Sequence, residues 1–125
     1  MRRDWPLKIE GVTISMLLLP NSERSGGFKL HPLSIPDHVA SVVLVLDLQQ
    51  HPGGSYHVVL ETAEGFEVRS FENLKSHPLE NGEQAIFLNL PPGSLRRGNF
   101  VIRVFNRTDQ KRVVELHPYS LSVVR

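Results

Sequence analysis

The chain has 125 residues and no cysteine, and its 14 Lys and Arg against 13 Asp and Glu give a formal net charge of +1. This length suits one domain with one hydrophobic core, and the missing cysteines exclude a disulfide framework and a thiolate zinc site. The balanced charge argues against a surface that follows a phosphate backbone, so we expect no nucleic-acid partner.

The N-terminal stretch MRRDWPLKI contains Arg2 and Arg3 but neither a long apolar run nor a cleavage site of small residues. It therefore does not predict a secretory signal. We predict that residues 1–11 are a linker or N-terminal extension and that residues 12–125 form a single domain. The apolar run Met16 to Leu19 ends at Pro20, far short of a bilayer span, so we expect membrane attachment only through a segment absent from this chain.

Strand signals dominate the remaining sequence, because apolar residues recur at every second position between clusters of Pro, Gly, Asn and Ser. Residues 39–48, VASVVLVLDL, are apolar at nearly every position and predict a central core strand. In chain order, we expect strands at residues 12–18, a short edge piece at 28–30, and then 39–48, 56–61, 66–71, 86–90, 100–104 and 113–123.

Turns and one break separate these strands. Ala63 to Gly65 predicts a hairpin turn, and LPPGSLRRGNF at 90–100 predicts a corner between two sheets. In the last strand Val114 and Leu116 have the opposite parity to Tyr119, and a slip of one residue swaps the faces of a strand. We therefore expect a bulge or an edge at residues 117–118, where the sequence is His-Pro.

No stretch of the chain shows a convincing helical period. Many short strands joined by Gly and Pro turns predict an all-β fold. The expected architecture is an immunoglobulin-like β-sandwich of seven to eight mostly antiparallel strands.

Four segments, VVLVLDLQ, SYHVVLETAEGFEV, LPPGSLRRGNFVIRVF and YSLSVVR, carry a family resemblance. In this order they resemble the C-terminal β-sandwich of bacterial membrane-anchored, anti-sigma-factor-like proteins, over residues 12–125. The resemblance implies a domain on the periplasmic side of the membrane, beyond an N-terminal zinc-binding domain and a membrane helix, with the cytoplasm as the alternative location. It implies no catalytic residue.

Two pairs of residues form the candidate interaction surface. Val43 and Val45 have the outward parity of their strand, so they form either an exposed apolar stripe or a covered central strand. Arg96 and Arg97 lie in the predicted corner and are expected to face solvent. We interpret the domain as a non-catalytic binding or protein-protein interaction module, the sensory domain of a membrane-anchored regulator, which contacts another protein or a second copy through an edge strand.

A carbohydrate- or small-ligand-binding module is the alternative function, with Trp5, Tyr56, Phe66 and Phe71 as the rings available for stacking. For that function Tyr56 has the wrong parity, because it is expected to point into the core.

Enzymatic and metal-binding functions find little support in the sequence. Four histidines precede proline, but their spacing matches no metal-ligand motif, and the serines lack a GxSxG elbow. Carboxylates in neighbouring strands alternate with apolar residues and are expected on a solvated face. The residues concerned are His31, His51, His77 and His117, Ser55, Ser70 and Ser94, and Asp47, Glu61, Glu64 and Glu67. We therefore predict no catalytic site, no metal and no cofactor.

Overall fold

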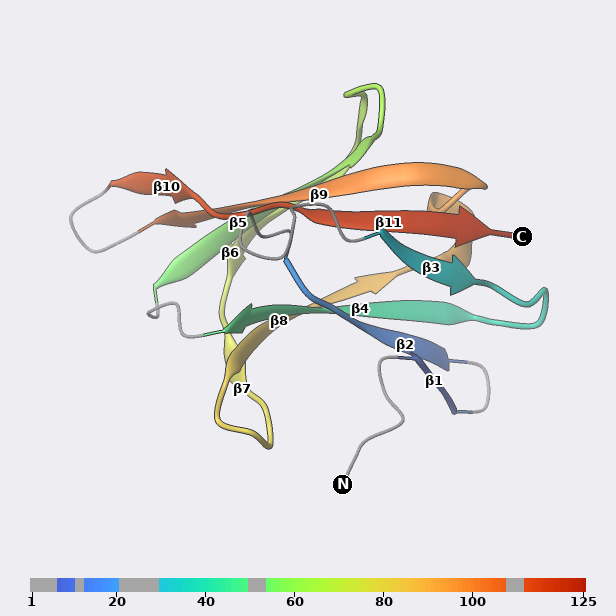
Figure 1. Cartoon of the computed structure of the whole chain (residues 1–125), viewed down its shortest axis with the longest axis horizontal. Coiled ribbons are helices and arrows are strands. Elements are labelled where there is room, and N and C mark those ends of the chain that lie inside the picture. Colours follow the sequence, from blue (N-terminus) through green and yellow to red (C-terminus); the bar gives the residue numbers. More distant parts are fainter. Residues whose placement is uncertain (1–6, 11–12, 21–29, 50–53, 108–111) are drawn as a thin grey trace.

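The structure of the chain is a computed structural model that describes residues 7–10, 13–20, 30–49, 54–107 and 112–125. These residues form two stacked β-sheets (Figure 1). The all-β sandwich expected from the sequence is confirmed. Within the described residues no helix is long and apolar enough to cross a membrane.

The five-stranded sheet has the order β1-β2-β4-β8-β7. Its strands are β1 (Leu7–Glu10), β2 (Thr13–Leu18), β4 (Ser41–Gln49), β8 (Gln84–Leu90) and β7 (His77–Pro78). Strand β1 lies inside the segment predicted to be a linker, where it pairs antiparallel with β2. The boundary of the regular structure is thus earlier than expected, because a short segment without a strand-length pattern forms a strand once a neighbour supplies hydrogen bonds.

The six-stranded sheet has the order β3-β11-β9-β5-β6, and β10 also pairs with β9. Its strands are β3 (Leu30–Ser34), β11 (Tyr119–Val124), β9 (Gly98–Arg107), β5 (Ser55–Thr62), β6 (Glu67–Leu74) and β10 (Val113–Glu115). The eleven strands of the described residues exceed the predicted seven to eight, since short strands such as β1 and β7 carry no periodic signal of their own. Most pairs are antiparallel, but β2 pairs with β4, and β3 with β11, in parallel.

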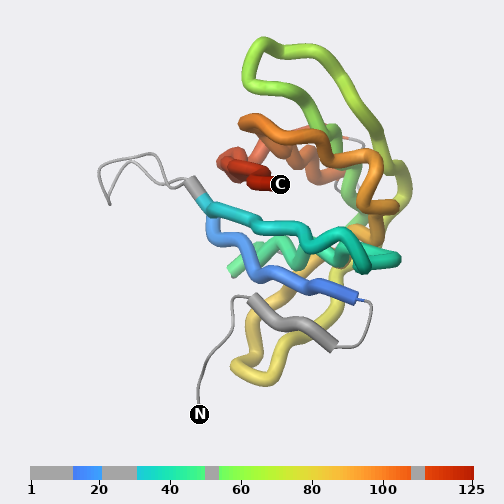
Figure 2. Tube along the Cα trace, turned by 90° about the vertical axis from the view of Figure 1, so that its right-hand side faces the viewer, coloured from blue at the N-terminus to red at the C-terminus, as the bar shows by residue number. Residues whose placement is uncertain are grey.

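The core lies between the sheets and consists of the inward side chains of alternating positions. The inner rows of β4 and β8 are buried, and so are the rows of β5 and β9 that face them from the other sheet. Figure 2 shows the two layers from the side, with β4 in one and β9 in the other. The main contributors are Val42, Leu44, Leu46, Ile86, Leu88, Val58, Leu60, Ile102, Val104 and Leu121.

The predicted corner between β8 and β9 has the expected burial. Leu90 and Leu95 are fully buried and Phe100 is 5% exposed, in one cluster with the inner row of β9. The chain turns through a short 3-10 helix at Pro92–Ser94, and the Arg125 side chain donates hydrogen bonds to the carbonyl oxygens of Pro92 (2.8 Å) and Leu95 (3.0 Å). The predicted burial of the apolar residues in this corner is confirmed.

The hairpin turn and the break in the last strand are also confirmed. Thr62 donates its backbone N–H to Phe66 O (2.8 Å), and Gly65 adopts a positive φ of 98° that a side chain would strain. Val113 pairs with Arg107 and Tyr119 with Ile102, so β10 and β11 follow β9 with one extra residue between them. This extra residue accounts for the change of parity that the sequence shows at 117–118.

Two side chains tie one sheet to the other. Tyr119 of β11 donates its hydroxyl to the backbone oxygen of Asp47 in β4 at 2.6 Å, and Tyr119 is 1% exposed. The pKa of Tyr119 is raised, first by burial and then by the nearby charge of Asp47 and by Tyr56, so the hydroxyl stays a donor.

The second tie is the imidazole of His31 in β3. Its Nε2 accepts the backbone N–H of Leu19 (3.2 Å), so the proton of the neutral ring sits on Nδ1, which donates to Ser120 O (3.0 Å). His31 thus has a structural role between the sheets, in place of the metal-binding role considered from its sequence.

Candidate functional site

The predicted apolar stripe on β4 is not an exposed surface. Val45 is fully buried and Val43 is half-buried, in a strand flanked on both sides by β2 and β8. On the same face Val45 lies between Leu17 and Phe87 in the ladder. The inclusion of Val45 in an interaction surface is therefore wrong, because a central strand receives cover from the side chains of both neighbours.

Arg96 and Arg97 are exposed, as predicted, in the loop that leads into β9. They lie on the connection between the sheets, whereas Val43 lies on the outer face of the five-stranded sheet. The four predicted residues do not form one continuous exposed surface.

The most exposed large apolar side chain of the described residues is Phe66, on the β5–β6 hairpin. Phe66 is 72% exposed and Val68 is 37% exposed, and Glu67 to Ser70 are all exposed. Both Figure 1 and Figure 2 show the turn between β5 and β6 projecting beyond the neighbouring strands. Phe66 is held there because its backbone N–H donates to Thr62 Oγ1 (3.1 Å) in addition to the turn hydrogen bonds. We call Phe66 and Val68 the hairpin tip.

Strand β6 is an edge of its sheet, and β5 is its neighbour in the described ladder. Two register shifts interrupt this ladder, one between Tyr56 and Val58 and one between Leu60 and Glu61, and Val68 has no partner in β5. Bulges of this kind increase strand twist and limit the pairing of an edge with another chain. A partner would therefore contact the side chains of the hairpin tip more readily than the backbone groups of the β6 edge.

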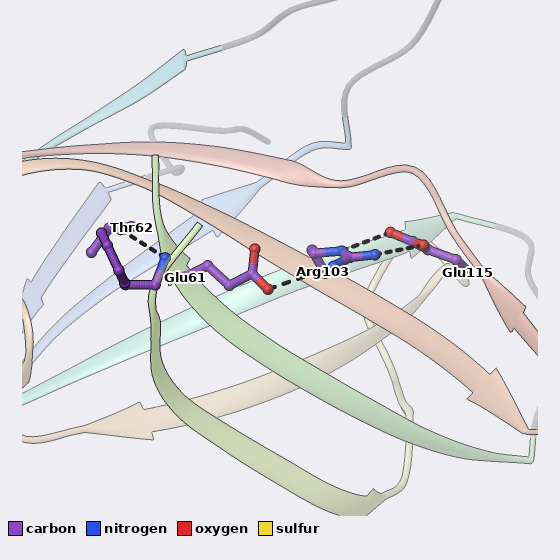
Figure 3. A network of polar contacts seen from close by, with 5 residues as sticks. Glu61, Thr62, Arg103 and Glu115 are labelled. Atoms are coloured by element: carbon purple, nitrogen blue, oxygen red, sulfur yellow. Dashed lines mark hydrogen bonds and ion pairs between the residues drawn. The ribbon is translucent and has the colours of Figure 1, made fainter. Parts of the chain in front are cut away.

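A charged network crosses the outer face of the six-stranded sheet (Figure 3). Arg103 of β9 donates two hydrogen bonds of 2.9 Å to Glu115 of β10 and lies 3.5 Å from a carboxylate oxygen of Glu61 in β5. The hydrogen bonds from Arg103 lower the pKa of Glu115. The Arg103 guanidinium also stacks over the Phe105 ring at 5.2 Å. Both carboxylates stabilise a single cation, so this network is a structural clamp on β10.

The clamp predicts a measurable but small coupling energy. In a double-mutant cycle of Arg103→Gln and Glu115→Gln, we expect a coupling of about 0.5–1 kcal/mol, since both groups are exposed and screened by solvent. Because the pKa of Glu115 is lowered in the fold, the coupling is present near neutral pH and is lost on acidification. Urea denaturation at pH 7 and in high salt measures it, and a coupling that salt leaves unchanged would contradict the ionic origin.

A groove of about 290 Å³ lies beside the clamp, at the end of β5 and β9. Its lining includes His57, Glu72, Phe105, Arg107 and Val113. The His57 ring packs edge-on against Phe105 at 5.9 Å, and its Nδ1 lies 4.0 Å from Glu72. The His57 and Phe105 rings stand edge to face beside opposite charges, so they do not form a flat stacking platform for a sugar.

The rings considered for carbohydrate binding do not gather on one surface. Tyr56 is 1% exposed, as its parity predicted, and Phe71 is partly buried against the core. Phe66 is exposed, and Trp5 lies outside the described residues.

Groups with acid-base or metal-binding chemistry are also dispersed. Among the described residues no cluster of three His, Asp or Glu side chains could hold a metal ion. His77 packs edge-on against Phe87, His117 is exposed in the β10–β11 connection, and His51 lies outside the described residues. Glu64 and Glu67 are exposed, as expected. The histidines thus have separate surroundings.

Asp47 departs from the prediction of a solvated carboxylate. It is 3% exposed, and its Oδ1 accepts the backbone N–H of Gln49 at 2.7 Å. Burial raises the pKa of Asp47 to about 6, the Gln49 N–H opposes the rise, and a hydrogen bond and a like charge from Glu83 add to it. The sequence signal missed here is the place of Asp47 within an otherwise apolar core strand.

Comparisons with known proteins leave the family open. No family model matches the sequence, and no curated protein matches it. CopC from Methylosinus trichosporium OB3b, a solved structure, is similar at 17% identity with a TM-score of 0.46, over 79% of this chain and 86% of that chain.

Proposed function

We propose that this domain is a non-catalytic protein-binding module that contacts its partner through the hairpin tip, Phe66 and Val68. The observation that carries the proposal is the 72% exposure of Phe66 on a hairpin projecting from the sheet. A large exposed aromatic side chain loses contact with water when a partner covers it, and aromatic residues are common at the centres of protein interfaces. The charged residues Glu67 and Arg69 flank Val68 and supply a polar rim.

The partner is either a different protein or a second copy of this chain, and the test below distinguishes the two. Register shifts limit the pairing of β6 with an added strand. We therefore expect the side chains of the hairpin tip to make most of the contact. The free edge of β6 next to the tip still offers backbone groups to an extended segment of the partner.

The family resemblance supports a wider role for this module. It implies a domain on the periplasmic side of the membrane that serves as the sensory part of a membrane-anchored regulator. A zinc-binding domain and a membrane helix upstream in the same reading frame would support that role. A reading frame that encodes neither would remove the support.

Site-specific photocrosslinking tests the proposed contact. A photoreactive benzoylphenylalanine at position 66 is expected to give a discrete adduct in cells of the source organism. The same residue at position 87 is the matched control, because Phe87 is also exposed (43%) but lies on the outer face of the other sheet. The mass of the adduct distinguishes a second copy from a different protein.

The identified partner then serves in a quantitative measurement. We expect Phe66→Ser to weaken binding at least about tenfold, since truncation of a central aromatic residue often removes more than about 1.4 kcal/mol. Phe87→Ser is expected to leave the affinity unchanged. Equal adducts from positions 66 and 87, or equal affinities of the two variants, would refute the hairpin tip as the contact.

A further inference from the structure

The turn between β7 and β8 contains the one Asn-Gly pair of the chain, Asn81 and Gly82. Both residues are exposed, and a Cβ placed on Gly82 would meet no atom within 4 Å. Gly82 has a positive φ of 87°, a backbone conformation that favours glycine. The space beside Gly82 is therefore open, and no side chain of its own screens its backbone nitrogen.

A glycine that follows an asparagine permits a reaction within the chain, because the two reacting groups are held close together by the backbone. The Gly82 nitrogen, once deprotonated, attacks Asn81 Cγ. An N–Cγ bond forms, the Cγ–Nδ2 bond breaks, and ammonia leaves with, in balance, the proton that the Gly82 nitrogen lost. Water then opens the resulting succinimide ring at one of its two carbonyl carbons. The products are aspartate and isoaspartate, and in isoaspartate the main chain is longer by one methylene group.

Three hydrogen bonds of the folded turn oppose this attack. The Gly82 N–H donates to Leu79 O at 2.9 Å. The Asn81 carboxamide is held by Glu83, since its Nδ2 donates to Glu83 Oε1 (3.1 Å) and its Oδ1 accepts the Glu83 backbone N–H (2.9 Å). Before the nitrogen can bond to Cγ, the Gly82 N–H has to leave its acceptor and the carboxamide has to turn away from Glu83. The folded turn therefore slows the reaction.

The other described asparagines are followed by residues with large side chains. Asn73 and Asn89 each precede a leucine, and Asn99 precedes a phenylalanine. Asn106 precedes an arginine and is 4% exposed. A large side chain hinders the approach of the nitrogen on its own residue. Among the described asparagines, Asn81 thus has the least hindered reaction partner.

We propose that Asn81 is a site of spontaneous covalent modification, at which the chain deamidates itself through the Gly82 nitrogen, and that the hydrogen bonds of the folded turn restrain the reaction. In both products a carboxylate replaces the carboxamide. The donor to Glu83 Oε1 is then lost, and a like charge stands in its place. The modification therefore loosens the turn that precedes β8 and adds a negative charge to the surface.

Mass spectrometry of the incubated protein tests the proposal. Trypsin cleaves after Lys75 and Arg96, so Asn81 and Asn89 lie in one peptide as the site and its internal control. The protein is incubated at about pH 7 in heavy-oxygen water, either folded or in urea, and is then digested in ordinary water. Only product formed before digestion carries the heavy oxygen. Electron-transfer fragmentation locates the label and distinguishes aspartate from isoaspartate.

The same chain is compared in its folded and unfolded states. In urea we expect labelled product at Asn81 well before any appears at Asn89. In the folded protein we expect the reaction at Asn81 to be at least about tenfold slower, because several hydrogen bonds have to open before the attack.

Variants of the turn test the origin of the restraint. Glu83→Ala removes the acceptor of the Asn81 Nδ2–H, so the rate in the folded protein is expected to rise severalfold while the rate in urea stays the same. Glu83→Gln retains a side-chain oxygen and is expected to keep the slow rate. Glu80→Ala, at an exposed residue of the same turn, is the matched control and should behave as the unmodified chain.

Four results would overturn the proposal. In urea, these are the absence of labelled product at Asn81 and equal labelling of Asn81 and Asn89. In the folded protein, a rate as fast as in urea would exclude the restraint, and equal rates in Glu83→Ala and Glu80→Ala would exclude its origin in the contact with Glu83.

Discussion

Phe100→Ala is expected to lower the free energy of unfolding by about 3–5 kcal/mol, which is a large part of the 5–15 kcal/mol typical of a domain. Phe100 is 5% exposed at the start of β9, opposite Leu121 of β11 and Thr62 of β5. Truncation leaves a cavity between three strands, and β-strands joined by ladders on both sides cannot move inward to fill it. Urea denaturation monitored by far-UV circular dichroism measures the loss of stability.

The matched control for Phe100→Ala is Arg97→Ala, three residues earlier in the same corner. Arg97 is exposed, so its truncation is expected to change the stability by less than about 0.5 kcal/mol. Equal midpoints of the two variants would place Phe100 outside the core and would reopen the corner as a binding loop.

Tyr119→Phe is expected to destabilise the domain by about 1–3 kcal/mol, although it removes only one oxygen atom. The hydroxyl is buried and donates to Asp47 O at 2.6 Å, so the substitution leaves a carbonyl in the core without this partner. The hydrogen bond also connects the two sheets, so its loss weakens their packing as well as one polar contact. Thermal denaturation of both proteins at one pH and one scan rate measures the difference.

Ser122→Ala, on the same strand as Tyr119, is the control for that experiment. Ser122 is half-buried on the outward parity of β11, and its truncation is expected to change stability by less than about 0.5 kcal/mol. A Tyr119→Phe protein as stable as the Ser122→Ala protein would show that the tie between the sheets contributes nothing.

The local pattern of the sequence determined the fold class and the core. Alternating apolar residues identified the inner rows of β5, β8 and β9, because the side chains of a strand point to opposite faces with a period of two, and the continuous apolar run at 39–48 identified β4 as a central strand. The same rule located the break before Tyr119, where one inserted residue reverses the parity. Two turns were marked by equally local features. Gly65 adopts a backbone conformation that favours glycine, and the prolines of Pro-Pro-Gly at 91–93 lack the N–H that a strand ladder needs.

Only the tertiary structure decided which side chains meet. Parity shows that Val45 points away from the core, but whether that position is covered depends on the neighbouring strands, and β2 and β8 belong to distant parts of the chain. Asp47 likewise became buried because the pairing of β4 with β8 places it opposite Ala85, which lies 38 positions later in the chain. Tyr119 met Asp47, and His31 met Leu19, across the two sheets. Contacts of this kind depend on how sheets stack and strands order themselves, which the period of a single strand does not encode.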